Sequence, residues 1–437
     1  LELYSDANGY NNAAALLSDK NQFSGIDIVR FGDNINIILD RETYNHQSIL
    51  SQFSKKLEGF MGARQTIQIN IERLQYLLDL FKIDELRLKS IIEPKLKKSI
   101  DLSQPINKGT LAEIDKIFNR GLDFYTNPNP INKANSSILF RKENINDDLG
   151  IGDVQFITSC EEQMRYISGL AKLSDFAFTQ RKLPNFSLQD SPQKVAQKMQ
   201  FLLPAQNKSD KQFLESFIKN LAEHNILVLE NIETHNKKHK SNLCGFFIKP
   251  NIIALKNQGR KREIFTLAHE LGHYLLDNEN IDKDIFIQNL QNEEKWCSQF
   301  AFYLLIGEKL SALESLQKNE INIENKTIKN ISNQKYISRL ALFYHCANSG
   351  KIKWSDYHSL KDKLDDEYKN KKEAQYNKQD ENEEKNKFIP IQPPILSPLQ
   401  KDIFVNAFLE GAIDEYTLRM RFKKYIKNNN LEGFIYG

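Results

Sequence analysis

The sequence predicts a multidomain α+β protein, and three observations lead to that fold class. The 437 residues are enough for about two to four domains, and a hydrophobic content of 40% is enough to build their cores. Short segments with helical periodicity follow one another from residue 66 to about residue 125. Three apolar runs of strand-forming residues then precede a strongly periodic helical segment. We therefore expect a helical module, a small sheet with helices around it, and a helical C-terminal tail.

The first 65 residues are expected to form an N-terminal α/β extension of unknown role. Residues 25–40 alternate apolar and polar side chains around Gly32-Asp33-Asn34, which predicts two strands joined by a turn, in a hairpin. Residues 49–61 have the spacing of a helix that follows this hairpin. Nothing in the segment suggests chemistry.

Residues 66–145 are expected to form a module of short helices. Apolar side chains from Ile71 to Phe81 define the first helix, and Asp84 can cap a second one, which Pro94 interrupts. A third helix, starting near Thr110, carries apolar residues from Leu111 onward.

The next segments are predicted to alternate helices and strands. Residues 146–182 act as a connector with one helix at residues 160–173, and a domain at residues 183–360 follows. Within this domain we expect helices at residues 191–202 and 210–224, then strands at residues 226–229, 244–248 and 252–255.

Residues 262–277 contain the strongest chemical signal, the H-E-x-x-H sequence from His269 to His273. Two imidazoles four residues apart lie on one face of a helix, about 5.4 Å apart along its axis, so both can reach one zinc ion. Glu270 lies beside them and is placed to take a proton from water. The stretch is predicted to be helical because its apolar residues recur at helical spacing on a face separate from the histidines. These residues are Ile264, Leu267, Ala268, Leu271 and Leu275.

Chance is a weak explanation of this pattern. Eight histidines and 57 acidic residues in 437 positions give roughly 0.02 accidental matches. Gly272 adds to the case, because glycine inside a helix costs about 1 kcal/mol relative to alanine and must be serving some need for space.

A zinc site that keeps one position open needs a third protein ligand. A third histidine in the H-E-x-x-H-x-x-G-x-x-H arrangement is excluded, because positions 276 and 279 are leucine and glutamate. The amphipathic segment 289–306 offers Glu293 and Glu294. Glu294 shares a helix face with small residues, which allow two helices to approach closely, whereas Glu293 shares one with bulky residues. We therefore assign Glu294 as the ligand, with a solvated charge at the helix start as its alternative role.

The remaining histidines favour ordinary roles. His235 and His239 are four residues apart in a lysine-rich loop, where a solvated loop is favoured over a second metal site. His345, in a predicted helix, could line the cleft and stabilise an oxyanion, but a packed helix histidine is the better interpretation.

At these residues the chain resembles the ImmA/IrrE family of bacterial zinc metallopeptidases. The resemblance rests on Arg262, Phe265-Thr266 and the H-E-L-G-H sequence, followed by a helix that matches at Glu294, Phe300 and Ala301. Cys297 and Ser298 stand where that family more often has Ala-Asn. The resemblance implies a gluzincin-like peptidase domain with His269, His273 and Glu294 on zinc, or on manganese in vitro, and Glu270 as the general base.

The module at residues 66–145 resembles a helix-turn-helix domain of phage repressors, but in a degenerate form. The expected recognition helix falls at residues 95–104, which hold Lys95, Lys97 and Lys98 but few side chains suited to read base edges. We therefore expect DNA binding to be weak or absent.

The end of the chain is expected to hold little chemistry. Residues 361–388 are nearly all charged or amide residues, typical of a solvated helix or a flexible linker, and residues 389–437 form the small helical tail. Four cysteines without a C-x-x-C pair, the lack of an 18-residue apolar run and the lack of a leader indicate a cytoplasmic protein that does not enter a membrane.

The resemblance implies a function as well. It suggests a metalloendopeptidase that cleaves a helix-turn-helix transcriptional repressor, in a stress response or in derepression of a mobile element. A non-proteolytic zinc-binding transcriptional regulator or a toxin–antitoxin component is the alternative, although Glu270 favours catalysis because a structural zinc needs no adjacent base.

Overall fold

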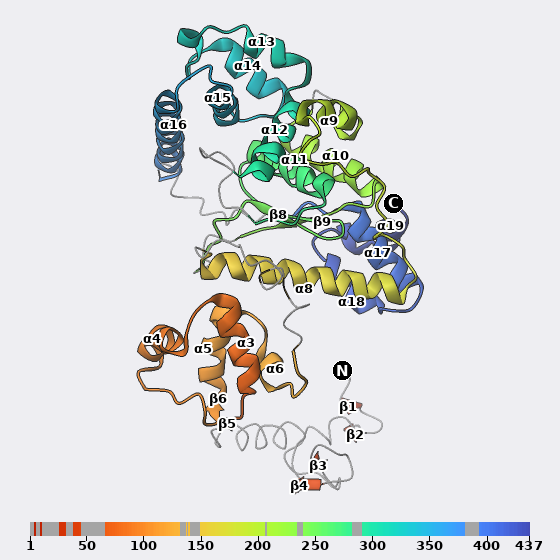
Figure 1. Cartoon of the computed structure of the whole chain (residues 1–437). Coiled ribbons are helices and arrows are strands. Elements are labelled where there is room, and N and C mark those ends of the chain that lie inside the picture. Colours follow the sequence, from red (N-terminus) through yellow and green to blue (C-terminus); the bar gives the residue numbers. More distant parts are fainter. Residues whose placement is uncertain are drawn as a thin grey trace. The chain divides into compact units, whose positions relative to one another are not determined.

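A computed structural model describes residues 66–131, 137, 139, 149–205, 208–233, 239–281, 291–380 and 393–437, together with four short strands before residue 45. For residues 371–380 it describes the backbone alone. The chain divides into two compact units, residues 1–131 and 132–437 (Figure 1). The boundary falls within the segment 66–145 that the sequence assigned to one module.

Two short strand pairs are described at the start of the first unit. Strand β1 (Tyr4–Ser5) pairs with β2 (Gly9–Tyr10), and β3 (Ile26–Phe31) pairs antiparallel with β4 (Ile38–Tyr44). The strand pair expected at residues 25–40 is therefore present, and its second strand ends at Tyr44, four residues beyond the expected end. Its turn, and the helix expected at residues 49–61, lie outside the described residues.

Four helices are described in the rest of the first unit, and polar side chains cap three of them. They are α3 (Ile71–Phe81), α4 (Glu85–Leu96), α5 (Lys108–Phe118) and α6 (Leu122–Thr126). Asn70, Asp84 and Asn107 accept hydrogen bonds from the first-turn backbone of α3, α4 and α5. Strands β5 (Thr66–Ile67) and β6 (Ile106–Asn107) pair beside these helices, whose fully buried side chains form a common core.

The prediction of a recognition helix at residues 95–104 is wrong. Helix α4 continues through Pro94 to Leu96. The proline removes one backbone hydrogen bond, but it lies so near the end of the helix that this loss does not end it earlier. Lys97 then takes a left-handed conformation with φ of 53° and ends the helix. Residues 98–105 form no helix, since the Glu93 carboxylate accepts from the Ile100 amide at 2.9 Å and Asp101 accepts from the Ser103 amide at 2.9 Å.

The second unit is built on a three-stranded sheet in the order β7-β9-β8. Strands β7 (Leu227–Asn231), β8 (Gly245–Ile248) and β9 (Ile252–Lys256) lie where the sequence predicted them. Strand β7 is parallel to β9 and β8 is antiparallel to it, with Phe247 opposite Ile253. The sheet is therefore mixed, and β8 is an edge strand among the described strands.

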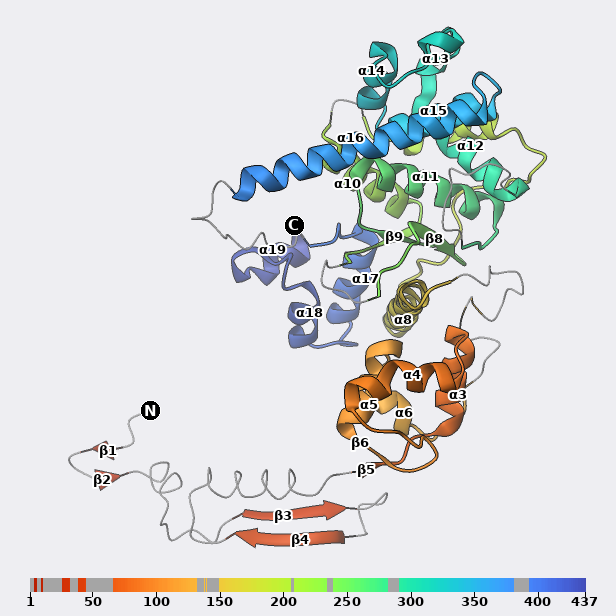
Figure 2. The ribbon, with the colours of Figure 1, turned by 90° about the vertical axis from the view of Figure 1, so that its left-hand side faces the viewer.

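Helices cover both faces of this sheet (Figures 1 and 2). Alternate residues of β9 point to opposite faces, so Ile253 and Leu255 enter one core while Ile252 and Ala254 enter the other. The first core contains α10 (Asp210–Glu223), α11 (Arg260–Leu276) and α12 (Asn292–Ile306). The second contains α8 (Ile151–Leu173) and the tail helix α17 (Pro398–Leu409).

The remaining helices extend these layers. They are α9 (Pro192–Met199), α13 (Leu310–Glu314), α14 (Lys326–Gln334), α15 (Arg339–Asn348), α16 (Trp354–Asp380), α18 (Glu415–Phe422) and α19 (Leu431–Tyr436), with short 3-10 turns between some of them. Helix α16 carries much of the charged segment predicted as a solvated helix or a linker, and Figure 2 shows its length.

Three further features bear on the sequence-based expectations. Helix α8 starts at Ile151, nine residues before the predicted start, and the Asp153 carboxylate accepts from the Gly150 amide at 2.9 Å in its first turn. None of the described helices is both long enough and apolar enough to cross a bilayer. All four cysteines are free and buried.

Candidate metal centre

Helix α11 carries the H-E-x-x-H sequence through the middle of the first core. It begins after Gly259 and ends at Asp277, which takes a left-handed conformation with φ of 50°. Every residue from Glu263 to Leu275 is buried, so the face with the histidines is enclosed as well as the apolar face. The sheet and α12 enclose them, which is why the helix can carry two imidazoles and a carboxylate away from bulk water.

The structure brings His269, His273 and Glu294 together. Their ligand atoms all lie within 4.8 Å of one another. The Nε2 atom of His269 is 3.0 Å from one carboxylate oxygen of Glu294, and the Nε2 atom of His273 is 2.9 Å from the other. Two imidazole nitrogens and a carboxylate that converge in this way are a donor set that suits zinc, as the sequence proposed. Glu293, the rejected candidate, is not part of this group.

Close helix packing explains how Glu294 reaches the histidines. A Cβ atom added to Gly272 would lie only 3.1 Å from both Cβ and Sγ of Cys297 on α12. The glycine that breaks the helical pattern thus provides room for the neighbouring helix. Small residues on both helices allow the short approach that Glu294 requires.

Helix α12 also contacts both imidazoles, although Nδ1 of His273 is buried without a hydrogen-bond partner among the described residues. Ser298 Oγ lies 3.3 Å from Nδ1 of His269, and the Cys297 thiol adjoins His273. With Nε2 as the ligand atom, Nδ1 of His269 carries the proton and donates a hydrogen bond to Ser298 Oγ, which fixes the ring orientation. One turn of α12 thus supplies the ligand Glu294 and the partner that orients His269.

The sequence did not identify Asn280 as part of the site. Its side-chain amide donates to Glu294 Oε1 at 2.7 Å and so holds the carboxylate toward the histidines. Asn280 follows the end of α11 in a polar loop and belongs to no spacing motif, so only the folded geometry shows its role.

The electrostatics of the group are those of a buried ionic cluster. Burial opposes the charge of Glu294, but His273 and His269 outweigh it and hold the pKa of the carboxyl well below its usual range. Burial also opposes the charged form of His273, yet Cys297 and Glu294 hold its pKa well above the ordinary value. For His269 burial prevails and lowers the pKa. The carboxylate is therefore ionised and ready to bind a cation.

Glu270 stands apart from this ligand group. It is 5% exposed, and its Oε2 atom is buried without a hydrogen-bond partner. Burial raises the pKa of this carboxyl to about 8, against the influence of His273 and of the Phe247 backbone amide. A buried carboxyl with an unsatisfied oxygen beside a metal-binding group has the character of a general base or acid.

The contact with Phe247 places Glu270 at the outer edge of β8. The Lys256 amide donates to Cys244 O at 2.9 Å, so the alternation of an antiparallel pair directs the backbone groups of Gly245 and Phe247 away from β9. No other strand of the described chain pairs with this edge. The edge can therefore accept an extended chain beside Glu270.

The other histidines considered lie elsewhere. His345 stacks on Phe302 with ring centroids 3.8 Å apart, which agrees with a packed helix histidine. Burial lowers its pKa to about 4. His235 lies outside the described residues, and His239 is not part of a metal-binding group among the residues that the structure describes.

Comparison with known proteins agrees with the geometry of this site. Residues 221–329 match the family model Peptidase_M78, described as the IrrE N-terminal-like domain. This match supports the resemblance of that segment to the ImmA/IrrE family. The matching stretch of the IrrE N-terminal-like domain runs from the end of α10 to α14 and includes His269, Glu270, His273 and Glu294. Neither the curated proteins nor the solved structures gave a match.

The family match indicates the general class of reaction that the IrrE N-terminal-like domain catalyses. A peptidase family with a His-His-Glu group suggests a metallopeptidase. The match does not extend to the helical module of the first unit.

Proposed function

We propose that the protein is a zinc-dependent metalloendopeptidase that hydrolyses a peptide bond in a helix-turn-helix transcriptional repressor. The observation that carries the peptidase part is the buried group of His269, His273 and Glu294, with the unsatisfied Glu270 carboxyl one residue from the first ligand. A purely structural metal site would gain nothing from such a carboxyl, because burying it without a partner is costly.

Each residue of the site has a distinct part in this function. His269, His273 and Glu294 would hold the zinc, which when bound acts as a Lewis acid on the peptide carbonyl and on water. Glu270 accepts a proton from the attacking water and then passes it to the leaving amine. Its raised pKa, about 8, suits a group that must both accept and release a proton near neutral pH.

The β8 edge supports an extended substrate. The backbone groups of Gly245 and the carbonyl of Phe247 face outward beside Glu270, so a peptide paired with this edge would present its carbonyl groups near the metal centre. Such a chain must be unfolded locally, so cleavage should fall in a loop or a frayed helix end of the substrate.

The proposal that the substrate is a repressor rests on the helical module of the first unit. The module resembles a repressor domain at the level of sequence, yet residues 98–105 form no recognition helix. Lys95 is engaged with Glu113 at 3.5 Å, which leaves Lys97 and Lys98 as exposed charges in this turn. This supports weak or absent DNA binding and a role in docking a related repressor.

The direct test is co-expression with helix-turn-helix repressors from the same genome, followed by intact-mass analysis. Wild-type protein supplied with zinc or manganese should cut one of them, and Glu270→Gln should bind the repressor without cutting it. Removal of residues 1–131 should impair cleavage of the folded repressor much more than cleavage of an unstructured peptide across the cut site.

Two outcomes would contradict the proposal. If no repressor is cut while binding persists in both wild type and Glu270→Gln, the non-proteolytic regulator or toxin–antitoxin component becomes the better interpretation. Sequence-specific, nanomolar binding of the first unit to DNA at physiological salt would contradict the docking role. Phosphate contacts by the two remaining lysines predict a salt slope of only about −1.8.

A further inference from the structure

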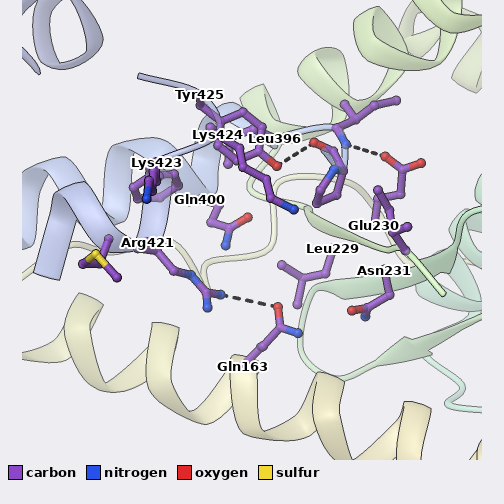
Figure 3. A pocket seen from close by; sticks show the side chains of 15 residues that line it. Gln163, Leu229, Glu230, Asn231, Leu396, Gln400, Arg421, Lys423, Lys424 and Tyr425 are labelled. Carbon is purple, nitrogen blue, oxygen red and sulfur yellow. Dashed lines mark hydrogen bonds between the residues drawn. The ribbon is translucent and has the colours of Figure 1, made fainter. Parts of the chain in front are cut away.

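A cavity of about 510 Å³ lies between the end of β7, helix α8 and the C-terminal tail (Figure 3). Gln163 of α8 and residues 229–232 contribute one side, while residues 394–396, Gln400 and residues 420–425 contribute the other. Its volume falls in the range of small-molecule sites, roughly 300–1,000 Å³. All these residues belong to the second unit, and none of them belongs to the metal centre.

The cavity carries an excess of positive charge. Arg421, Lys423 and Lys424 are the basic residues of its lining, and Glu230 is the single acidic one. Within the described part of the chain, none of the three basic side chains is within ion-pair distance of a carboxylate. Figure 3 shows the Lys424 side chain extending toward Leu229. The Arg421 guanidinium lies below Gln400 in the same view.

Glu230 does not compensate this charge, because its carboxylate is already engaged. One oxygen accepts from Arg260 Nη1 at 2.7 Å and from Asn257 at 3.1 Å, and the other accepts from the Ile395 amide. The carboxylate is fully buried and paired with Arg260, which also pairs with Glu263 and does not line the cavity. An anion in the cavity would therefore meet three basic side chains and one carboxylate that other donors already hold.

The other lining groups suit a polar ring. Gln400 has no hydrogen-bond partner among the described residues, and Gln163 is contacted by Arg421 at 3.5 Å, the limit for a hydrogen bond. Leu229 and Leu396 supply apolar surface, and Tyr425 is fixed by its hydroxyl, which donates to Pro394 O at 2.6 Å. Amide side chains beside apolar walls recognise the edge and the face of a heteroaromatic ring, whereas an acyl chain would leave the amides desolvated and unpaired.

We propose that this cavity binds a small organic phosphate of the mononucleotide class, with the phosphate on Arg421 and Lys424 and the ring between Gln400 and the Leu229–Tyr425 side. Arginine and lysine are the residues that bind phosphate in proteins. The inference goes beyond the proposed peptidase activity, since binding here needs neither the metal nor a peptide.

Isothermal titration calorimetry of the full chain at about 0.15 M salt tests this proposal. The probes are AMP, GMP, CMP and UMP, with adenosine and inorganic phosphate as the two separate halves. At least one mononucleotide should bind with a stoichiometry of one and at least tenfold more tightly than either adenosine or phosphate.

Variants then locate the site. Arg421→Gln/Lys424→Gln should weaken binding at least tenfold, whereas the matched charge change Lys369→Gln/Lys427→Gln, outside the cavity, should not. Gln400→Trp leaves the charge unchanged and fills the cavity, so it should also abolish binding. The proposal fails if no mononucleotide binds better than its halves, if binding survives in Gln400→Trp and in the Arg421/Lys424 variant, or if an oligonucleotide binds more tightly than the mononucleotides.

Discussion

Gly272 on α11 lies against Cys297 on α12, and a Cβ atom at position 272 would be 3.1 Å from both Cβ and Sγ of that cysteine. This contact sets the distance between the helix with the two histidines and the helix with Glu294. The metal centre therefore depends on a residue that offers no ligand atom.

We expect Gly272→Ala to destabilise the protein by about 1–2 kcal/mol, although alanine is the better helix former by about 1 kcal/mol. The added methyl group forces α11 and α12 apart, so metal affinity should fall as well. The control is Gly169→Ala in α8, where an added Cβ would meet nothing within 4 Å. This substitution should stabilise the protein by about 0.5–1 kcal/mol. Chemical denaturation of both variants measures the difference, and a favourable coupling with Cys297→Gly would assign the strain to this contact.

Zinc binding should depend on the three residues assigned as ligands. The purified protein is expected to bind about one zinc, and His269→Ala should lose it, because a catalytic zinc needs three protein ligands. Glu294→Gln should weaken binding strongly, whereas the matched change Glu293→Gln should leave it unaltered, and Glu270→Gln should retain the metal. Elemental analysis after gel filtration gives the stoichiometry. Equal zinc content in Glu294→Gln and wild type would show that the ligand assignment is wrong.

Zinc should also stabilise the fold through mass action. A ligand at a hundred times its dissociation constant adds about 2.7 kcal/mol to the free energy of unfolding. Removal of the metal with a chelator should lower the melting temperature of the wild type, and this shift should be absent in His269→Ala.

Ser298 is expected to tune metal affinity without binding metal. Ser298→Ala removes the acceptor 3.3 Å from Nδ1 of His269, so the ring is no longer held in its ligand orientation. Loss of such a partner typically costs 10–100-fold in affinity, and this long contact should give about tenfold. Ser332→Ala, which removes another buried hydroxyl from α14, is the control and should not change zinc affinity in a competition assay with a chromophoric chelator.

Much of the second unit could be predicted from sequence because its signals are local. The three strands are short apolar runs, and α11 and α12 show helical spacing. The choice of Glu294 over Glu293 relied on which residues share a helix face, and that is a property of local geometry. The structure places Glu294 with the histidines for that reason.

Other features depend on contacts that no local pattern encodes. Asn280 reaches Glu294 only because the chain turns back after α11, and the tail helix α17 packs beside α8 although the two are more than 200 residues apart. At residues 95–104, resemblance suggested a helix, but side chains of Glu93 and Asp101 hold the backbone in a turn. Local hydrogen bonds there competed with helix formation and prevailed.

His345 should make stability depend on pH. Its pKa is about 4 in the folded state because of burial, and about 6.5 in an unfolded chain, so the unfolded state binds more protons between these values. Its contribution to stability is therefore complete above pH 6.5 and is lost as pH falls toward 4, by on the order of 3 kcal/mol. His345→Phe keeps the stacking on Phe302 and should reduce the loss of unfolding free energy between pH 7 and 4. Parallel pH profiles of wild type and variant would contradict this.

Glu230 is expected to hold the tail segment against the sheet and the first turn of α11. Its carboxylate joins the Ile395 amide to Arg260, the first residue of α11, and Arg260 also contacts Glu263. Glu230→Met keeps the volume but leaves the Ile395 amide without its acceptor and Arg260 with one carboxylate in place of two. Removing one partner of a buried ion pair costs about 3–5 kcal/mol, and the remaining Glu263 should limit the loss to the lower end.

Hydrogen exchange provides the local measurement for this change. In Glu230→Met the Ile395 amide should exchange faster, together with its neighbours before α17, because the hydrogen bond that protects it is gone. Glu230→Gln retains a neutral acceptor and should show a smaller effect. Glu233→Gln, on a carboxylate that pairs with Lys256 at 3.6 Å, is the matched control and should leave exchange at residue 395 unchanged. If Glu230→Met exchanges there as slowly as wild type, the tail is held by apolar packing of α17 alone.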